Sequence, residues 1–127
     1  MNLNSMGLVK NMTVSGPVAP YRILAFDAAA STIRQAAAAA DLILGVSGQV
    51  GTVAADERLD VYMDAVRTVE FGGTFEAGDP LTADVDGKAI KAVPGVGTTI
   101  RIIGFAMEKG AASVLGQVHI APQTMRG

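Results

Sequence analysis

The stretch VRTVEFGGTFEAGDPLTADVDGKAIK, residues 66–91, decides the fold. Apolar and polar residues alternate over residues 68–71, which is the period of a half-buried β-strand. Gly72-Gly73 ends this run, and Gly-Asp-Pro at residues 78–80 is a turn signal before the next strand-like run. Asp86-Gly87 then separates two short runs, which is a strong signal for a tight β-hairpin. The stretch therefore predicts antiparallel strands joined by short turns.

Similar runs elsewhere predict about eight to ten short strands. They are expected at residues 10–15, 21–26, 42–47, 59–71, 81–84, 88–93, 100–107 and 113–121. The run 59–71 changes phase near Ala65, which predicts a bulge or two short strands there. Many short strands at hairpin spacing are typical of sandwiches and small barrels. We expect an all-β, mainly antiparallel, single-domain β-sandwich or small β-barrel over residues 9–127, with a flexible N-terminal arm at residues 1–8.

The alanine-rich segment 27–41 fits two structures. Alanine has the highest helix propensity, but Ser31-Thr32-Ile33 is poor helix material and the segment has no apolar stripe. We expect a strand at residues 32–35, followed by one helical turn that ends near Asp41. Whether residues 28–41 form helix or strand stays open at the level of sequence.

Composition limits the class of protein. The 127 residues suffice for one domain that buries roughly two thirds of its unfolded surface. The chain has no cysteine, which excludes disulfides, thiolate nucleophiles and Cys-ligated metals. We expect neither secretion nor membrane insertion, because there is no signal-peptide pattern and no apolar run of about 18 residues. Only 17% of residues are charged, so the surface is easily buried against a partner.

The charges are unevenly distributed. Residues 56–86 hold nine acidic and two basic residues, a net −7, whereas the remainder holds three acidic and eight basic residues, a net +5. The basic residues are scattered singly with few aromatic neighbours, so we expect no nucleic-acid binding. The acidic segment fits either a solvated edge or a surface that docks on a basic partner.

Each candidate for metal binding or acid–base catalysis lacks a feature that its chemistry requires. Asp84-Val85-Asp86-Gly87 imitates the start of an EF-hand loop, but the closing ligands are missing, so we expect a turn and no metal. His119 is the only histidine, and on an alternating strand it is expected to be a surface or interface residue. Glu57, with Asp60 or Asp64, lies in a polar run where nothing suggests a raised pKa.

Nucleophilic catalysis and phosphate binding lack their motifs as well. Ser47 lacks the GxSxG spacing of a nucleophile elbow. The glycines of residues 95–99 are not followed by Gly-Lys-Ser or Gly-Lys-Thr, so they form no phosphate-binding loop. We therefore expect no enzymatic activity and no cofactor.

A series of short motifs recurs in the order of a known family. The motifs are LILGVS at 42–47, AADERLDV at 54–61, VEFGG at 69–73, GDPLT at 78–82, DGKA at 86–89 and IIGFA at 102–106. Over roughly residues 20–122 this order resembles the head decoration, or capsid cement, proteins of tailed bacteriophages. The resemblance implies a β-rich protein without catalytic residues that binds as a symmetric oligomer to the outside of the mature shell.

The resemblance predicts a structural virion protein that stabilises contacts between capsomers. Its expected partners are the major capsid protein and itself, as a homodimer or homotrimer. Its expected location is the outer surface of the capsid, after synthesis in the host cytoplasm. Low charge and abundant small apolar side chains fit this role. Leu3, Met6 and Leu8 make the N-terminal arm a possible partner-binding segment, because a free arm can add a strand to a neighbour.

The alternative is a small ligand-binding β module displayed on a virion, for carbohydrate binding or adhesion to a host surface. Sugar sites usually need an aromatic platform. The chain has no tryptophan, two tyrosines and four phenylalanines, and most of these lie in core-like strand positions. The aromatic content therefore disfavours this alternative. An enzyme ranks third.

Overall fold

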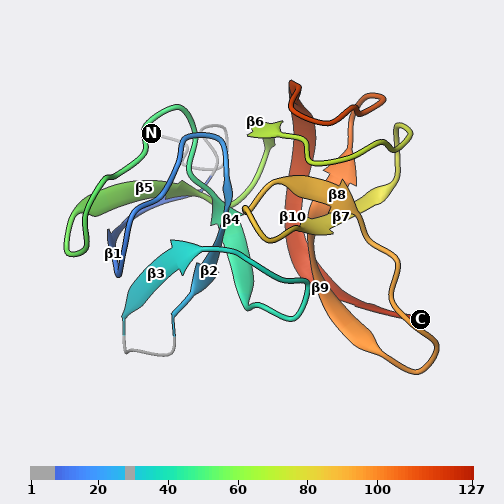
Figure 1. Ribbon diagram of the computed structural model, residues 1–127, viewed down its shortest axis with the longest axis horizontal. Helices are drawn as coiled ribbons and strands as arrows, with labels where there is room; N and C mark the ends of the chain where they lie inside the picture. The colour runs from blue at the N-terminus through green and yellow to red at the C-terminus, as the bar shows by residue number, and fades with distance from the viewer. Residues whose placement is uncertain (1–7, 28–30) are drawn as a thin grey trace.

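The computed structural model describes residues 8–27 and 31–127, which form ten β-strands and no helix (Figure 1). The strands are β1 Val9–Val14, β2 Ile23–Phe26, β3 Thr32–Gln35, β4 Ile43–Val46, β5 Arg58–Tyr62, β6 Val66–Glu70, β7 Pro80–Ala83, β8 Ala89–Lys91, β9 Thr99–Ala106 and β10 Leu115–Arg126. The predicted all-β, mainly antiparallel class is confirmed. The first five strands close a barrel in the order β1-β3-β2-β4-β5, and the last five form a sheet in the order β6-β10-β9-β7-β8.

The barrel closes through β1, which has a different partner at each end. Its first part pairs antiparallel with β5, from Val9 opposite Tyr62 to Thr13 opposite Arg58. Its last two residues pair in parallel with β3, where Val14 lies opposite Ile33. Apolar side chains from these strands and their loops fill the barrel: Val14, Val18, Leu24, Ile33, Leu44, Leu59 and Val61.

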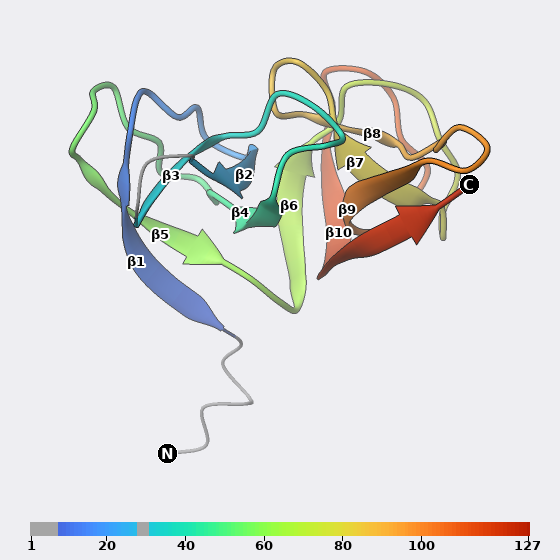
Figure 2. The ribbon, with the colours of Figure 1, turned by 90° about the horizontal axis from the view of Figure 1, so that it is seen from below.

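Strands β2 and β4 form the wall between barrel and sheet, and Figure 2 shows β4 on the side of the barrel that faces the sheet. Leu24 packs in the barrel core, whereas Ile23 and Ile43 pack against apolar residues of the sheet. Because both faces of these strands are covered, their sequences are almost continuously apolar. The second core joins the two halves: Ile23, Ala25, Ala36, Ile43 and Val46 from the barrel meet Val69, Phe71, Phe75, Leu81, Ala83, Ala89, Ile103, Ala106, Val118 and Ile120.

The sheet confirms the predicted hairpin around Asp86-Gly87, but β6 and β7 do not pair with each other and are joined by the longer segment 71–79. Strands β7 and β8 form the expected hairpin, with Ala83 opposite Ala89. The phase change near Ala65 separates two strands, β5 and β6, and Ala65 itself has φ of 66°. β10 runs five residues past its predicted end at Ala121, because a register shift between Ile120 and Gln123 accommodates Pro122, which cannot donate a ladder hydrogen bond.

One of the two predictions for the alanine-rich segment is confirmed. Residues 32–35 form β3, which confirms the expected strand, but the expected helical turn near Asp41 is wrong. The Asp41 carboxylate accepts hydrogen bonds from the N–H groups of Ala37 and Ala38 and pairs with both terminal guanidinium nitrogens of Arg34. The Ala39 carbonyl accepts the N–H of Arg101 in β9 at 2.8 Å. The N–H of Asp41 donates to the Ala38 carbonyl at 3.2 Å, so the segment closes one hydrogen-bonded turn that does not continue as a helix.

Candidate functional site at the junction of barrel and sheet

The turn between β7 and β8 docks on the barrel. The Gly87 carbonyl accepts the N–H of Ile23 at 2.8 Å. The Asp86 carbonyl accepts Nε of Arg22 at 3.0 Å and Nε2 of Gln35 at 2.8 Å. The turn predicted from Asp86-Gly87 is therefore also a contact between the two halves of the molecule.

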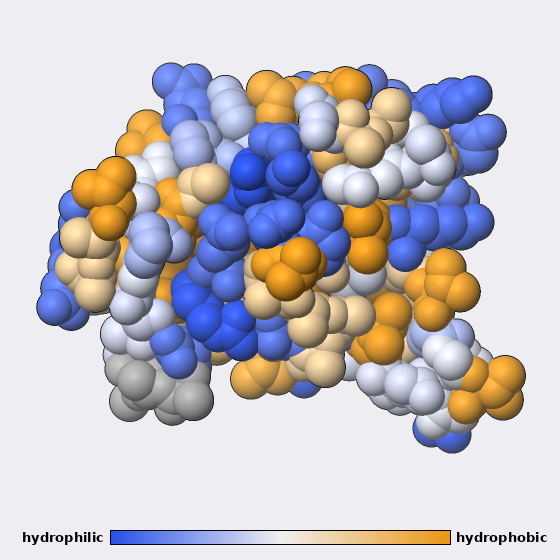
Figure 3. Space-filling model, viewed as in Figure 1, coloured by the Kyte–Doolittle hydropathy of each residue, from blue (hydrophilic) through white to orange (hydrophobic). Residues whose placement is uncertain are grey.

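A small ion-pair network lies beside this turn. One Glu70 carboxylate oxygen lies 2.8 Å from Arg22 of the barrel, and the other lies 3.0 Å from Nζ of Lys88. The three side chains are 15–22% exposed, and Figure 3 shows a hydrophilic stripe over this part of the molecule. The hydrogen bond from Lys88 and the charge of Arg22 outweigh partial burial and hold the pKa of Glu70 below its ordinary value of 4.5.

We expect Glu70→Gln to destabilise the protein by about 1–2 kcal/mol at neutral pH, because two partly buried cations lose their shared anion. The sign of the pH effect follows from the lowered pKa of Glu70. The ion pairs contribute their full stability above the pKa of the unfolded chain, and this contribution is lost as pH falls through the lower folded pKa. Melting curves measured from neutral to acidic pH check this: the variant should lose less stability on acidification than the wild type.

Glu76→Gln is the matched control, because Glu76 is exposed and forms no salt bridge with any residue in 8–27 or 31–127. It should leave the pH dependence of melting unchanged. If Glu70→Gln and wild type lost stability in parallel on acidification, the role given to Glu70 would be wrong.

A pocket of about 480 Å³ opens at the same junction. Tyr21, Gln49 and Tyr62 line it from the barrel, and Arg67, Thr68 and Gln117 line it from the sheet. The Arg67 guanidinium carbon lies 4.6 Å from the centroid of the Tyr62 ring, within cation–π range. Nε of Arg67 donates to the carbonyl of Asp64 at 3.2 Å, which fixes the guanidinium at the pocket.

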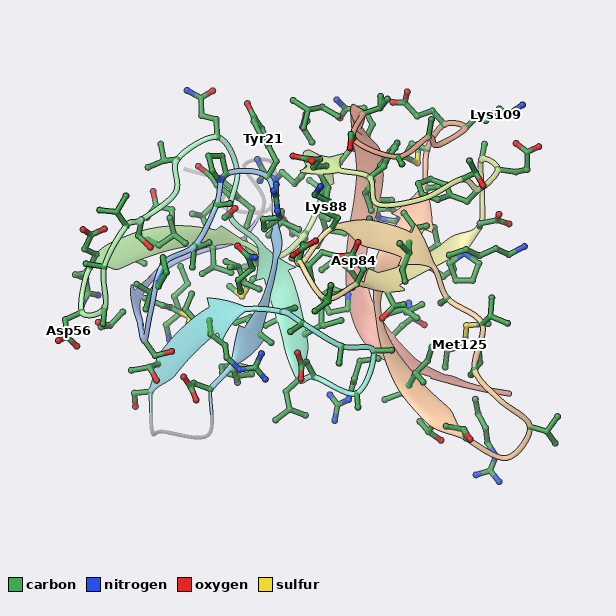
Figure 4. All side chains as sticks on the ribbon, in the orientation of Figure 1. Tyr21, Asp56, Asp84, Lys88, Lys109 and Met125 are labelled. Carbon is green, nitrogen blue, oxygen red and sulfur yellow. The ribbon has the colours of Figure 1, made fainter. Side chains whose placement is uncertain are left out.

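Tyr21 lines this pocket and has an unusual backbone conformation. Its φ is 59°, in the left-handed region, which residues other than Gly, Asn and Asp rarely adopt. Its N–H donates to the Gly48 carbonyl at 2.6 Å, and its carbonyl accepts the N–H of Glu70 at 2.9 Å. Figure 4 shows the Tyr21 side chain pointing outward at the junction. These two hydrogen bonds hold Tyr21 between a barrel loop and β6.

A second, more apolar groove lies on the barrel. It has a volume of about 690 Å³ and is lined by Pro17, Ala19, Pro20, Gly51 and Val53, among others. The Val53 side chain is 86% exposed. The backbones on either side are joined by an isolated antiparallel bridge between Val18 and Thr52. This groove is a second candidate surface for a partner.

Of the predicted arm residues, Leu3 and Met6 lie outside the described residues. Leu8 is described, and its side chain is 59% exposed. Its N–H donates to the Asp64 carboxylate at 2.6 Å, and its carbonyl accepts the N–H of Met63 at 2.9 Å. Leu8 therefore continues the pairing between β1 and β5.

The residues considered for catalysis have structural contacts. Ser47 is buried, and its hydroxyl donates to the Ala19 carbonyl and accepts the N–H of Arg22, each at 3.0 Å. The Asp84 carboxylate accepts the N–H groups of Asp86 and Lys88, each at 2.9 Å, as a turn requires. His119 is exposed in the middle of β10, as expected.

The remaining carboxylates considered for catalysis are not brought together as a pair by these contacts. Glu57 accepts the N–H of Val53, and Asp60 accepts the side-chain amide of Asn11. Across residues 8–27 and 31–127, no group of three His, Cys, Asp or Glu side chains is placed to hold a metal ion. None of those residues belongs to a helix that is long and apolar enough to cross a membrane.

The acidic segment 56–86 does not form one patch. Figure 4 shows Asp56 at the far end of the barrel and Asp84 at the junction. Of the other acidic residues, Glu70 forms the network described above and Asp79 pairs with Lys91 at 3.7 Å. A single acidic docking surface is therefore not present along this segment.

The aromatic residues are distributed differently from the sequence-based expectation. Phe71 and Phe75 are buried and pack edge to face, with ring centroids 4.7 Å apart. Phe26, however, is 44% exposed, and both tyrosines are partly exposed in the junction pocket. Sequence reasoning missed this pocket because Tyr21 and Tyr62 lie 41 residues apart and a tyrosine does not itself signal a positive φ.

This fold is similar to that of a solved phage structure. The fold resembles the base of a phage head fibre. Its counterpart is the crystal structure of the head fibre gp8.5 N base in bacteriophage phi29, with a TM-score of 0.65 and 23% sequence identity. The match covers 90% of this chain and 93% of that chain. No protein-family model and no curated protein matches the chain.

Proposed function

We propose that this protein is a structural component of a phage virion that attaches to the outside of the head. The observation that carries the proposal is the fold similarity to a phage head fibre base over nearly the full length of both chains. The order of short motifs over residues 20–122, which resembles head decoration proteins, supports the same role. The base of a head fibre and a decoration protein would both have to bind the shell.

We propose further that it acts as a cement: it binds the major capsid protein of the mature shell as a homodimer or homotrimer and strengthens contacts between capsomers. A protein that binds only the expanded lattice stabilises that lattice by mass action. Many identical weak contacts become strong when they act together. We propose no enzymatic activity, and the structural contacts of Ser47, Asp84 and the carboxylates support this.

Binding to purified heads tests the function. We expect the protein to co-sediment with expanded, mature heads and not with compact precursor shells, because the proposed cement role requires a binding surface that only the expanded lattice presents. Bound protein should also raise the resistance of the heads to heat or chelation. Equal binding to both forms of the shell would count against a cement role.

The arm is tested by deleting residues 1–7, which leaves the hydrogen bonds of Leu8 in place. We expect the melting temperature of the isolated protein to stay nearly unchanged. Attachment to heads or to sister subunits should weaken at least tenfold, about 1.4 kcal/mol, because Leu3 and Met6 can no longer be buried on a partner. Co-sedimentation and light scattering measure these two effects.

A full-length variant, Leu3→Ser with Met6→Ser, is the control for the arm. It keeps the chain length but removes the apolar side chains, and it should behave like the deletion. If the deleted protein attaches and assembles as well as the full chain, the attachment surface lies on the β-domain itself.

A further inference from the structure

Tyr21 has a conformation that glycine would adopt at lower energy. A side chain other than glycine in the left-handed region costs on the order of 1 kcal/mol. The Tyr21 ring does not belong to either apolar core and is partly exposed at the junction pocket. The fold therefore holds an aromatic ring at this pocket despite backbone strain and without burying it in the interior.

The pocket carries a positive charge although it borders the most acidic part of the sequence. Arg67 is the one charged residue among its lining residues. Arg67 makes no salt bridge with any residue of the described chain, and its side chain donates a hydrogen bond to the Asp64 carbonyl. A guanidinium has five N–H donors in a planar fork that matches a carboxylate. The charge of this pocket suits an anionic group.

The other polar lining groups suit hydroxyls. Gln49 is exposed, and its side-chain amide can both donate and accept a hydrogen bond. Gln117 also lines the pocket; its side-chain nitrogen donates to the Thr68 hydroxyl at 3.0 Å, and its amide oxygen can accept a hydrogen bond. Binding sites of this kind combine an apolar surface with a few polar groups that fix orientation.

We propose that the junction pocket binds an acidic saccharide, a sugar that carries a carboxylate. Arg67 binds the carboxylate, the Tyr21 ring packs on the apolar face of the sugar, and Gln49 and Gln117 bind its hydroxyls. Tyr62 supports Arg67, whose guanidinium lies over its ring, and so is not the stacking platform. This activity goes beyond attachment to a capsid, and it would give a virion protein affinity for acidic surface polysaccharides.

The protein contains its own reporter for this pocket. It has no tryptophan and two tyrosines, and both tyrosines line the pocket. Tyrosine fluorescence of the full chain therefore reports on this site alone. We expect glucuronate to change the fluorescence in a saturable way, with a Kd of about 1 mM, as is usual for a ligand of this size. Glucose and inorganic phosphate serve as comparison ligands and should bind at least tenfold more weakly.

Two variants separate binding from folding. Arg67→Gln should weaken glucuronate binding at least tenfold, whereas Lys109→Gln, an exposed cation outside the pocket, should not change it. Tyr21→Gly fits the positive φ, so the protein should still fold, as shown by its melting curve, and should lose binding at least tenfold by calorimetry. The proposal is overturned by no saturable response, by phosphate binding as tightly as glucuronate, or by unchanged binding in Arg67→Gln or Tyr21→Gly.

Discussion

Gly104→Ala is expected to destabilise the protein by more than about 4 kcal/mol, at the far end of the range for single substitutions. Gly104 is buried in β9, between Leu81 of β7 and Ile120 of β10. Its φ is 154°, in a region that is essentially restricted to glycine. A Cβ atom there would overlap the carbonyl oxygen of His119, which belongs to the backbone of β10. Neither strand can move without breaking the ladder between them.

Chemical denaturation measures this loss, and in thermal unfolding we expect a melting temperature at least about 15 °C below that of the wild type. Gly78→Ala is the matched control. Gly78 also has a positive φ, 89°, but no atom lies within 4 Å of its added Cβ. It therefore reports backbone strain alone, at about 1–2 kcal/mol. A Gly104→Ala protein as stable as Gly78→Ala would show that the overlap with β10 is relieved.

The strands could be predicted from sequence because their signals are local. The hairpin of β7 and β8 follows from Asp86-Gly87 between two short runs, and the division into β5 and β6 follows from the phase change near Ala65. A period of two residues is a property of neighbouring side chains, and it survives in any all-β arrangement. The choice between sandwich and barrel is not local, since it depends on which strands meet.

The closure of the barrel could not be predicted for this reason. It depends on the parallel pairing of Thr13 and Val14 with Thr32 and Ile33, across a long connection that includes the tight loops around Pro17 and Pro20. The alanine-rich segment shows the same limit for propensity. Five consecutive alanines favour a helix, but in the fold their backbone groups bind the Asp41 carboxylate and the N–H of Arg101 instead.

The candidate site was hidden in the sequence by distance and by residue type. Its tyrosines belong to different segments, and Arg67 looks like one charge among many in an acidic run. What the sequence did allow was the exclusion of catalytic motifs, because these require fixed spacings that the chain lacks. Surfaces built from loops of two sheets have no such spacing, and only the assembled fold brings their residues together.

The second large effect is expected at the β7–β8 turn, where Gly87→Val should destabilise the protein by about 3–5 kcal/mol. Gly87 has φ of 73°, which a β-branched residue resists. Its added Cβ would lie 2.7 Å from Cγ of Gln35 and 3.1 Å from the Ala36 carbonyl oxygen. The substitution therefore strains the turn and also separates it from the barrel. Gly97→Val is the matched control, because Gly97 has φ of 75° and open surroundings, so its loss of stability reports the backbone strain alone.

Asp84→Asn at the same turn should change stability by less than about 1 kcal/mol, because an amide oxygen can still accept the N–H groups of Asp86 and Lys88. Calcium should leave the melting temperature of the wild type unchanged if Asp84 and Asp86 only shape the turn. Denaturation curves of Gly87→Val, Gly97→Val and Asp84→Asn measure the changes in stability. A calcium titration of the wild type shows whether the turn also binds the ion. A rise of several degrees with calcium, lost in Asp84→Asn, would show that the turn binds the ion.

A Gly87→Val protein no less stable than Gly97→Val would instead show that the contact between the turn and the barrel does not hold the two halves together.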